Sequence, residues 1–538
     1  MEQPGDRSNV LYVMVIVLTA LFLRFFELGS QSLWLDEAVI YSQTKAASVA
    51  EVYSTVMEQE GHIGPLYHIL NYLCSRVFGY SEWALRLPSA VYGTISVLLV
   101  YMVASALWGS RAALLSSALM AFSPLHVWYS QEARMYSLWL MLILAAVLLF
   151  IRMLEKRSRS LWVLLTVCAS LCLWTFLNSV FVFAGLGLYL LISHRKHKLQ
   201  WYEYALCIGL AVVTYLPGIA ALLAKQTIAV GSTRQTSVFD LAYTFYVFNV
   251  GTTFGPTLYA IRASLKQFGA ISAACRILSD NVLTILPPVL LFGGLLAVGI
   301  RHAISERRNE SYKLTLVLLF VPSTLIFTIA LFSRSLAFNV RYVLCALPFY
   351  LMLLSVTLTR LSATKKQVLV ALTFVLYLVS LFNHYFTDKY AKLDFRSVVK
   401  YLHETMRDDD KAIILHEWAR PIIEYYDKTG TLSQYCIPQT DSVAAACSII
   451  NHSKRIFYVK SAVIQQYDER LIAAIEKLLL QDFALVDSTN HVSHVQIDVY
   501  ARRISYTRET RLANPRADHT SLLEGDELAA REINRQAH

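Results

Sequence analysis

Long apolar runs separated by short polar loops dominate roughly the first 390 residues of the chain. A helix of about 20 apolar residues is long enough to cross the hydrocarbon layer of a bilayer. The pattern therefore predicts a polytopic α-helical membrane protein with about eleven transmembrane helices. The predicted spans lie near residues 10–26, 85–107, 112–127, 135–152, 161–176, 177–193, 203–224, 282–300, 313–332, 342–358 and 367–386.

Composition supports a membrane protein and argues against a nucleic-acid-binding protein. The chain has 538 residues, of which 56% are hydrophobic and only 16% are charged, and this is more apolar than a soluble globular protein. Its formal net charge of +10 would suggest a nucleic-acid partner in a soluble domain. Here the basic residues cluster in short loops between apolar runs, where they record membrane orientation. We therefore expect no nucleic-acid partner.

The charge of the short loops predicts which side of the membrane each loop faces. With the N-terminus in the cytoplasm, the short inner loops carry 15 Lys and Arg and the short outer loops carry 3. The positive-inside rule favours this orientation. With an odd number of spans, the two long loops at 27–84 and 225–281 then lie outside, together with everything after residue 386.

Beyond about residue 390 the pattern becomes that of a soluble domain. Short apolar runs such as "RIFYV" and "VQIDVYA" alternate with amphipathic stretches such as "FRSVVKYLHETM". This alternation predicts a small extracytoplasmic α/β domain over residues 391–505, after a transmembrane domain over 1–390. Residues 506–538 are polar and predict a disordered tail. A disulfide between Cys436 and Cys447, both in the outer region, is left open.

Five polar clusters lie at the predicted outer ends of the spans. Ionisable groups at bilayer depth are expensive, so groups kept there should face a cavity or one another. For any single cluster, solvation or snorkelling to the interface is the simpler interpretation. Five clusters on one side favour a shared polar pocket. They contain Asp36 and Glu37 in "WLDEA", His62 and Tyr67 in "GHIGPLYH", Arg86 in "ALRLPS", Glu132, Arg134 and Tyr136 in "SQEARMY", and Arg341 and Tyr342 in "FNVRY".

These clusters carry a family resemblance. The segments "LWLDEA", "HIGPLYHIL", "ALRLPSAVYGTISVLLVY", "FSPLHVWYSQEARMYSL" and "FNVRYVLCALPFYLMLLS" occur in this order. Together they resemble the C-type glycosyltransferases that use polyprenyl-phosphate sugars. Within this class the chain is most similar to the bacterial relatives of protein O-mannosyltransferases, which include lipid A aminoarabinose transferases and lipopolysaccharide core galacturonosyltransferases. The resemblance covers about residues 10–400 and extends into "KLDFRSVVKYL".

The resemblance implies a C-type glycosyltransferase fold and a role for each matching residue. Asp36 matches the catalytic carboxylate of the first outer loop, and its neighbour Glu37 is the second candidate catalytic residue. Glu37 and Glu132 would orient a substrate or pair with an arginine, and both interpretations stay open. Many relatives have Thr-His-Tyr near "LWTFLNS", where this chain has Phe176 and Asn178. The residues expected to bind the donor phosphate are Arg86, Arg134, Arg341 and Tyr342, and those expected to bind substrate are His62, Tyr67, Glu132 and Tyr136.

Sugar transfer from a polyprenyl phosphate needs few groups. The phosphate is already a good leaving group, so the reaction requires a base for the acceptor hydroxyl and cations for the phosphate. We assign Asp36 as the base and the arginines as phosphate ligands, because a guanidinium binds phosphate oxygens bidentately. No cofactor is required. His62, His68 and His126 leave a divalent cation open, but they define no ligand set, so we assign no metal site.

The resemblance thus implies an inverting transferase in a bacterial inner (plasma) membrane, and the loop charges predict that its site faces the periplasm or exterior. Its partners would be membrane lipids, a polyprenyl-phosphate sugar donor, and a hydroxyl or phosphate acceptor on a lipid, glycan or protein. A lipid-diphosphate-dependent ligase is the nearest alternative. A transporter or flippase would place ionisable groups at mid-span and show paired repeats. A non-enzymatic sensor would not explain the clusters at the span ends.

Overall fold

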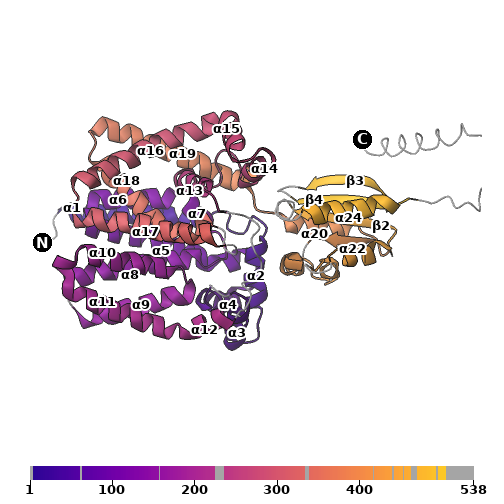
Figure 1. Cartoon of the computed structure of the whole chain (residues 1–538), viewed down its shortest axis with the longest axis horizontal. Helices are drawn as coiled ribbons and strands as arrows, with labels where there is room; N and C mark the ends of the chain where they lie inside the picture. Colours follow the sequence, from indigo (N-terminus) through magenta and orange to yellow (C-terminus); the bar gives the residue numbers. More distant parts are fainter. Residues whose placement is uncertain are drawn as a thin grey trace, which may run out of the picture.

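A helical bundle and a smaller sheet-containing domain lie next to each other along the long axis of the molecule (Figure 1). This computed structural model describes residues 4–60, 63–156, 158–224, 236–333, 338–415, 417–438, 442–451, 453–461, 469–491 and 495–503.

The bundle begins with α1 (Pro4–Phe25), α2 (Leu35–Thr44), α3 (Val49–Gln59), α4 (Leu66–Phe78), α5 (Glu82–Trp108), α6 (Ser110–Phe122), α7 (Pro124–Ser130), α8 (Tyr136–Glu155), α9 (Arg159–Thr175) and α10 (Ser179–Ile192). It continues with α11 (His194–Thr214), α12 (Leu216–Ala224), α13 (Val238–Val250), α14 (Leu258–Phe268), α15 (Ala270–Asp280), α16 (Val282–Ser305), α17 (Glu310–Phe332), the 3-10 helix η1 (Val340–Ala346), α18 (Leu347–Thr359) and α19 (Ala363–Phe386).

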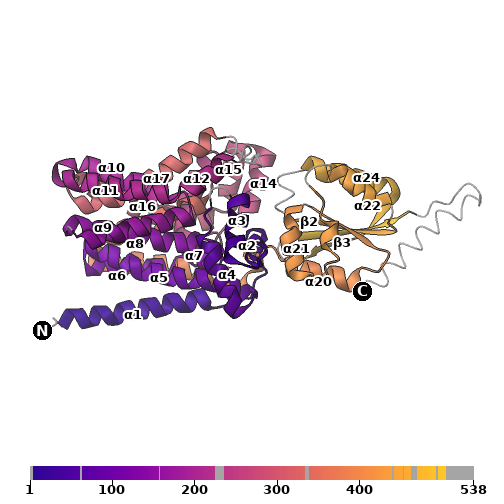
Figure 2. The same cartoon turned by 90° about the horizontal axis from the view of Figure 1, so that it is seen from below.

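Among the described residues, seven helices are long and apolar enough to cross a membrane, or up to nine if each of two bent helix pairs is one span. The shorter apolar helices α9 and α10 occupy two further ranges where the sequence predicts spans. The total of eleven stays a prediction. Within the bundle, 89% of the segment formed by η1 and α18 is buried, against 11% of α1. The η1–α18 segment is therefore central, whereas α1 lies along one edge (Figure 2).

A break between α6 and α7 sets the outer end of the bundle. The two helices meet at an angle of 59°, because Pro124 cannot donate the hydrogen bond that would continue α6. The carbonyls of Met120 and Ala121, near the end of α6, instead accept bonds of 3.2 and 3.1 Å from the buried Arg24 guanidinium. Arg24 therefore connects the end of α1 to this break. Helix α7 follows the break and leads to the loop at 131–135.

The C-terminal domain contains a four-stranded sheet in the order β1-β2-β4-β3. β1 pairs with β2 in parallel, and the other two pairs are antiparallel. The segments "RIFYV" and "VQIDVYA" form strands and "FRSVVKYLHETM" forms a helix, as the sequence pattern predicts. Its elements are η2 (Asp388–Tyr390), α20 (Phe395–Thr405), β1 (Lys411–Ile414), η3 (Glu417–Ala419), α21 (Arg420–Tyr426), η4 (Ser433–Tyr435), α22 (Ser442–Asn451), β2 (Arg455–Ser461), α24 (Glu469–Asp482), β3 (Phe483–His491) and β4 (Val495–Arg502).

The two parts share a hydrophobic core. Leu33 and Leu35, at the start of α2, belong to the same buried cluster as Phe395 of α20 and Ile422 of α21. The C-terminal domain therefore packs directly on the segment that carries the predicted catalytic carboxylate. Cys436 and Cys447 of this domain are both free thiols, and the predicted disordered tail at 506–538 lies outside the described residues.

Candidate active site

The first turn of α2 places Asp36 and Glu37 at the end of the bundle that meets the C-terminal domain. Acidic side chains are favourable there, because the N-terminus of a helix carries a partial positive charge. Glu37 also accepts a hydrogen bond from the backbone N–H of Trp34 at 3.2 Å. This bond closes the first turn, and the two neighbouring carboxylates point into different surroundings.

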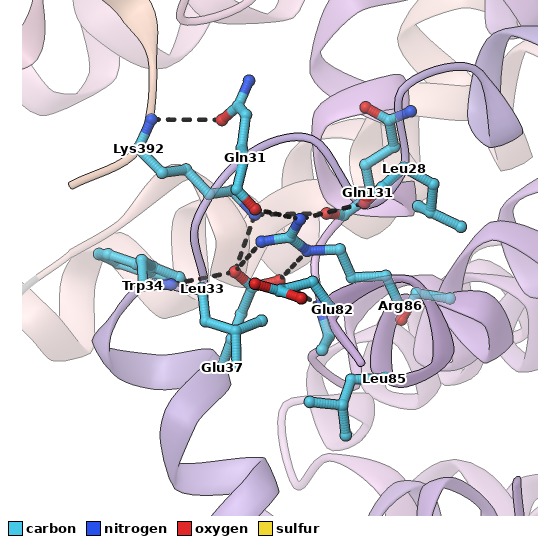
Figure 3. A network of polar contacts seen from close by, with 12 residues as sticks. Leu28, Gln31, Leu33, Trp34, Glu37, Glu82, Leu85, Arg86, Gln131 and Lys392 are labelled. Atoms are coloured by element: carbon cyan, nitrogen blue, oxygen red, sulfur yellow. Dashed lines mark hydrogen bonds and ion pairs between the residues drawn. The ribbon is translucent and has the colours of Figure 1, made fainter. Parts of the chain in front are cut away.

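Glu37 is enclosed in a complete set of polar contacts (Figure 3). Its side chain has no exposed surface and pairs with Arg86 at 2.8 Å and with the Lys392 ammonium at 3.1 Å. The backbone N–H of Ala133 donates a further bond of 2.8 Å. One carboxylate thus joins α2, α5, the 131–135 loop and the segment that leads into the C-terminal domain.

Arg86 uses all five of its donors in the same cluster. It donates to both oxygens of Glu37 and to the backbone carbonyls of Leu28, Gln31 and Ser32, at 2.8 to 3.0 Å. A guanidinium has five N–H donors, so none remains for a phosphate. This differs from the phosphate-binding role that the sequence predicts for Arg86.

Asp36 is the open carboxylate of the pair. Its side chain is 32% exposed and binds Arg341 of η1 at 2.6 Å. Arg134 donates to the Asp36 carbonyl at 3.4 Å and lies 3.6 Å from Glu60. The Nε atoms of Arg134 and Arg341 are buried without a hydrogen-bond partner. Two arginines with unused donors therefore flank one accessible carboxylate, which is a suitable arrangement for binding an anion beside a base.

The surrounding charges keep both α2 carboxylates ionised. Burial raises the pKa of Asp36, but Arg341 and Arg134 outweigh this effect and hold the pKa below its usual value. Burial likewise opposes the ionisation of Glu37, but Arg86 and Lys392 lower its pKa to about 2.

Glu132 is a buried carboxylate with a different charge environment. Its side chain is 2% exposed, and its Oε1 atom has no hydrogen-bond partner. Burial raises the pKa of Glu132 to about 7; Lys392 and Arg341 oppose this rise, whereas the charges of Glu37 and Asp36 add to it. The buried Glu132 carboxyl group therefore holds its proton more tightly than an ordinary glutamate does.

Aromatic rings form one wall of the site. The Arg341 guanidinium lies over the rings of Tyr136 and Tyr342, at 5.8 and 5.4 Å from their centroids. Phe176, which stands where many relatives have a histidine, packs 6.0 Å from Tyr342. These rings position Arg341 through cation–π contacts.

The structure separates Tyr67 from the rest of the predicted site. Tyr67 is fully buried, and its hydroxyl forms a 2.9 Å hydrogen bond with Ser89, so it joins α4 to α5. His62 lies outside the described residues. His68 is buried on α4, whereas His126 contacts Arg24 at 2.7 Å. Within the described ranges, no group of three or more His, Cys, Asp or Glu side chains is arranged to hold a metal ion.

Two contributors to the site were missed by the sequence analysis: Lys392 and Glu60. Gln131 belongs to the "SQEARMY" cluster but was given no role of its own. Gln131 donates to the Phe26 carbonyl at 2.7 Å and pairs with His384 of α19 at 2.8 Å. Lys392 was visible only as the lysine of "KLDFR", directly after the last apolar run. A single lysine in a polar segment after a span is usually exposed to solvent, so the pattern does not indicate its burial.

Comparison with known proteins supports a glycosyltransferase. The family model described as dolichyl-phosphate-mannose-protein mannosyltransferase matches residues 62–219. YkcB of Bacillus subtilis (strain 168), whose assignment as a mannosyltransferase is provisional, is 24% identical over 252 residues. That match covers 44% of this chain and 34% of YkcB, so the chain spans about a third of this curated relative.

Solved structures match over almost the whole chain. Apo ArnT from Cupriavidus metallidurans superimposes with a TM-score of 0.57 at 12% identity, covering 91% of this chain and 98% of ArnT. ArnT bound to undecaprenyl phosphate gives a TM-score of 0.52 at 13% identity, covering 92% and 98%.

The chain is therefore an integral membrane protein with the C-type glycosyltransferase fold. Because the match to ArnT covers 91% of this chain, it extends beyond the helical bundle into the C-terminal domain. The resemblance predicted from the sequence is confirmed, as is the fold class of a polytopic helical protein with a small C-terminal α/β domain.

Proposed function

We propose that this protein transfers a sugar, with inversion, from a polyprenyl-phosphate donor to a hydroxyl or phosphate acceptor on a lipid, glycan or protein. The observation that carries the proposal is the accessible Asp36 carboxylate, flanked by Arg341 and Arg134 in a chain with the fold of ArnT. We place the proposed reaction at the outer face of a bacterial inner membrane. The sequence resemblance to lipid A aminoarabinose transferases supports an acceptor in lipopolysaccharide as one form of this proposal.

In the proposed reaction, Asp36 takes the proton of the acceptor hydroxyl while the acceptor oxygen attacks the anomeric carbon. The bond from that carbon to the phosphate oxygen breaks, and Arg134 and Arg341 stabilise the phosphate as it gains charge. Arg341 binds Asp36 in the structure. In the proposed reaction, a donor phosphate would attract the Arg341 guanidinium away from Asp36, and the basicity of the Asp36 carboxylate would rise when it accepts the proton.

Glu37 and Arg86 receive structural roles in this proposal. Their polar groups are occupied by one another, by Lys392 and by backbone atoms, so either residue would have to break buried contacts before touching substrate. Glu132 and Tyr136 are proposed to orient the substrate. Tyr342 is proposed to bind the donor phosphate together with Arg341.

The test measures sugar transfer by the purified full-length protein from a panel of synthetic polyprenyl-phosphate sugars. Asp36→Asn should lower kcat by about 10²- to 10⁴-fold, the usual contribution of a general base. Asp409→Asn is the matched control, because Asp409 is a 71% exposed carboxylate of the C-terminal domain. Equal kcat in Asp36→Asn and native protein would remove Asp36 as the base. Transfer only from lipid diphosphates would replace the proposal with the ligase alternative.

A further inference from the structure

The segment that enters the C-terminal domain inserts a lysine into the polar cluster beside the active site. Lys392 lies between η2 and α20, and its residue surface is 9% exposed. Its ammonium donates to Glu37 at 3.1 Å and to the Gln131 carbonyl at 3.3 Å. Its backbone N–H donates to the Gln31 side chain at 3.2 Å, so both ends of the residue are fixed to the bundle (Figure 3).

Glu37 does not need Lys392 for charge balance. Arg86 already neutralises the carboxylate through two bonds of 2.8 Å. Burying a second cation requires stripping its water, which is unfavourable unless nearby groups compensate. The groups that compensate are Glu37, which follows Asp36 in α2, and the carbonyl of Gln131, which begins the 131–135 loop. The charge of Glu132 in the same loop adds to them. Lys392 therefore ties the start of α2 to the 131–135 loop that carries Arg134.

Helix α21 of the same domain also contacts α2 and the residues just before it. The Tyr426 hydroxyl accepts a 2.8 Å bond from the backbone N–H of Leu33 and donates to Glu82 at 3.0 Å. The Tyr425 ring packs edge-on against Tyr41 of α2, with centroids 4.8 Å apart. Polar and aromatic contacts from the C-terminal domain thus begin before α2 and continue along it.

We propose that the C-terminal domain holds the Asp36 helix in its reactive position, with Lys392 as the positioning residue between the domain and the active site. This inference rests on the proposed transferase function. Lys392 does not touch the reacting atoms. It acts through Glu37, which lies in the first turn of α2 and fixes the turn that carries Asp36. The outer domain is then part of the catalytic unit and not only an acceptor platform.

The first experiment compares Lys392→Met with Lys400→Met in the full-length protein. Lys400 is the control, because its side chain on α20 is 75% exposed. We expect Lys392→Met to lower kcat by about 10- to 100-fold, the usual effect of a small misplacement of a reacting group. The KM for the donor should stay the same, because Arg134 and Arg341 are retained. Lys400→Met should match the native protein in both constants.

A second readout does not depend on turnover. Hydrogen exchange of the backbone amides in residues 33–44 should be faster in Lys392→Met, because loosening a local contact favours local opening. Tyr426→Phe removes only one hydroxyl that holds Leu33, so it tests the same inference if Lys392→Met fails to fold. It should also lower kcat and speed exchange over this segment.

The outcomes separate this inference from the proposed function. Native kcat and native exchange in Lys392→Met and Tyr426→Phe would overturn the positioning role while leaving the transferase intact. A higher donor KM with unchanged kcat in Lys392→Met would also overturn it, by making Lys392 a donor ligand. If native protein transfers no sugar, the proposed function fails, and exchange over 33–44 still decides whether the C-terminal domain holds α2.

Discussion

At the residue scale, Asp36 and Glu37 are neighbours in sequence with opposite surroundings. Asp36 is 32% exposed and contacts one arginine, whereas Glu37 has no exposed surface and contacts two cations. The difference arises because successive side chains on a helix point about 100° apart. Two adjacent carboxylates therefore serve two purposes, one chemical and one structural.

This difference predicts separable effects of the two amide substitutions. Glu37→Gln leaves Arg86 and Lys392 without a carboxylate, so it should destabilise the protein by about 3–5 kcal/mol, as for other broken buried ion pairs. Asp36→Asn should change stability far less, because its site is partly solvated. Thermal unfolding in detergent measures both. A Glu37→Gln protein that keeps native stability but loses activity would instead favour a direct catalytic role for Glu37.

Glu132 predicts a pH dependence of stability. Its pKa is raised to about 7 in the folded protein from an ordinary value of 4.5, so the folded state binds the proton more tightly than the unfolded state. Its contribution to stability is therefore present below about pH 4.5 and is lost as the pH rises to about 7. Glu132→Gln removes this pH-dependent contribution to the free energy of unfolding.

The measurement for Glu132 is the difference in unfolding free energy between Glu132→Gln and native protein at pH 5 and pH 8. Relative to native, the variant should gain stability on going to pH 8, by roughly 1.4 kcal/mol for each unit of pKa shift that lies within this window. The same difference at both pH values would show that the Glu132 pKa is not raised.

At the element scale, a close approach of two segments places the start of α4. Gly64 donates a 3.2 Å hydrogen bond to the carbonyl of Thr175, at the end of α9. A Cβ atom at Gly64 would lie 2.0 Å from the Trp174 carbonyl oxygen, which is far inside contact distance. Only glycine fits between these two backbones, so this position in "HIGP" has a packing explanation.

Gly64→Ala should therefore destabilise the protein by about 1–3 kcal/mol, as overpacking does elsewhere, and should lower transfer by shifting Glu60 and its partner Arg134. Gly209→Ala is the matched control, because a Cβ at Gly209 in α11 meets nothing within 4 Å. It should leave stability unchanged or slightly raised. The measurement is the unfolding temperature of each variant. Equal unfolding temperatures for Gly64→Ala and Gly209→Ala would refute the close backbone contact at Gly64.

At the scale of the whole molecule, the candidate site and the C-terminal domain lie at the same end of the bundle (Figure 1). The turn between α16 and α17 lies at the other end, where Ser311 bonds to the Leu107 carbonyl near the end of α5. The basic loops of the sequence belong to this other end. The proposed orientation thus places the site outside and this turn in the cytoplasm.

Cysteine labelling in intact cells tests the orientation. In a background with Cys74, Cys275 and Cys447 replaced by serine, Lys454→Cys in the C-terminal domain should react with a membrane-impermeant maleimide, since Lys454 is 82% exposed. Arg308→Cys, in the exposed turn between α16 and α17, should react only after the membrane is permeabilised. The reverse pattern would place the site in the cytoplasm.

The sequence by itself determined the class of protein and the segments that form its site. Long apolar runs can only be satisfied in a bilayer by spanning helices, and short alternating runs after residue 390 indicated the sheet domain. The motif around "WLDEA" and the arginines Arg134 and Arg341 were likewise readable, because charges near span ends are rare and must meet partners.

Tertiary structure alone decided which of these residues are free to act. Whether Arg86 holds a phosphate or a carboxylate depends on its five donors, whose partners come from the distant loop at 28–32 and from Glu37. The burial of Lys392, 355 positions after Glu37, depends on how the C-terminal domain packs against α2. Such long-range contacts leave no period or spacing in the chain, so only the folded structure specifies them.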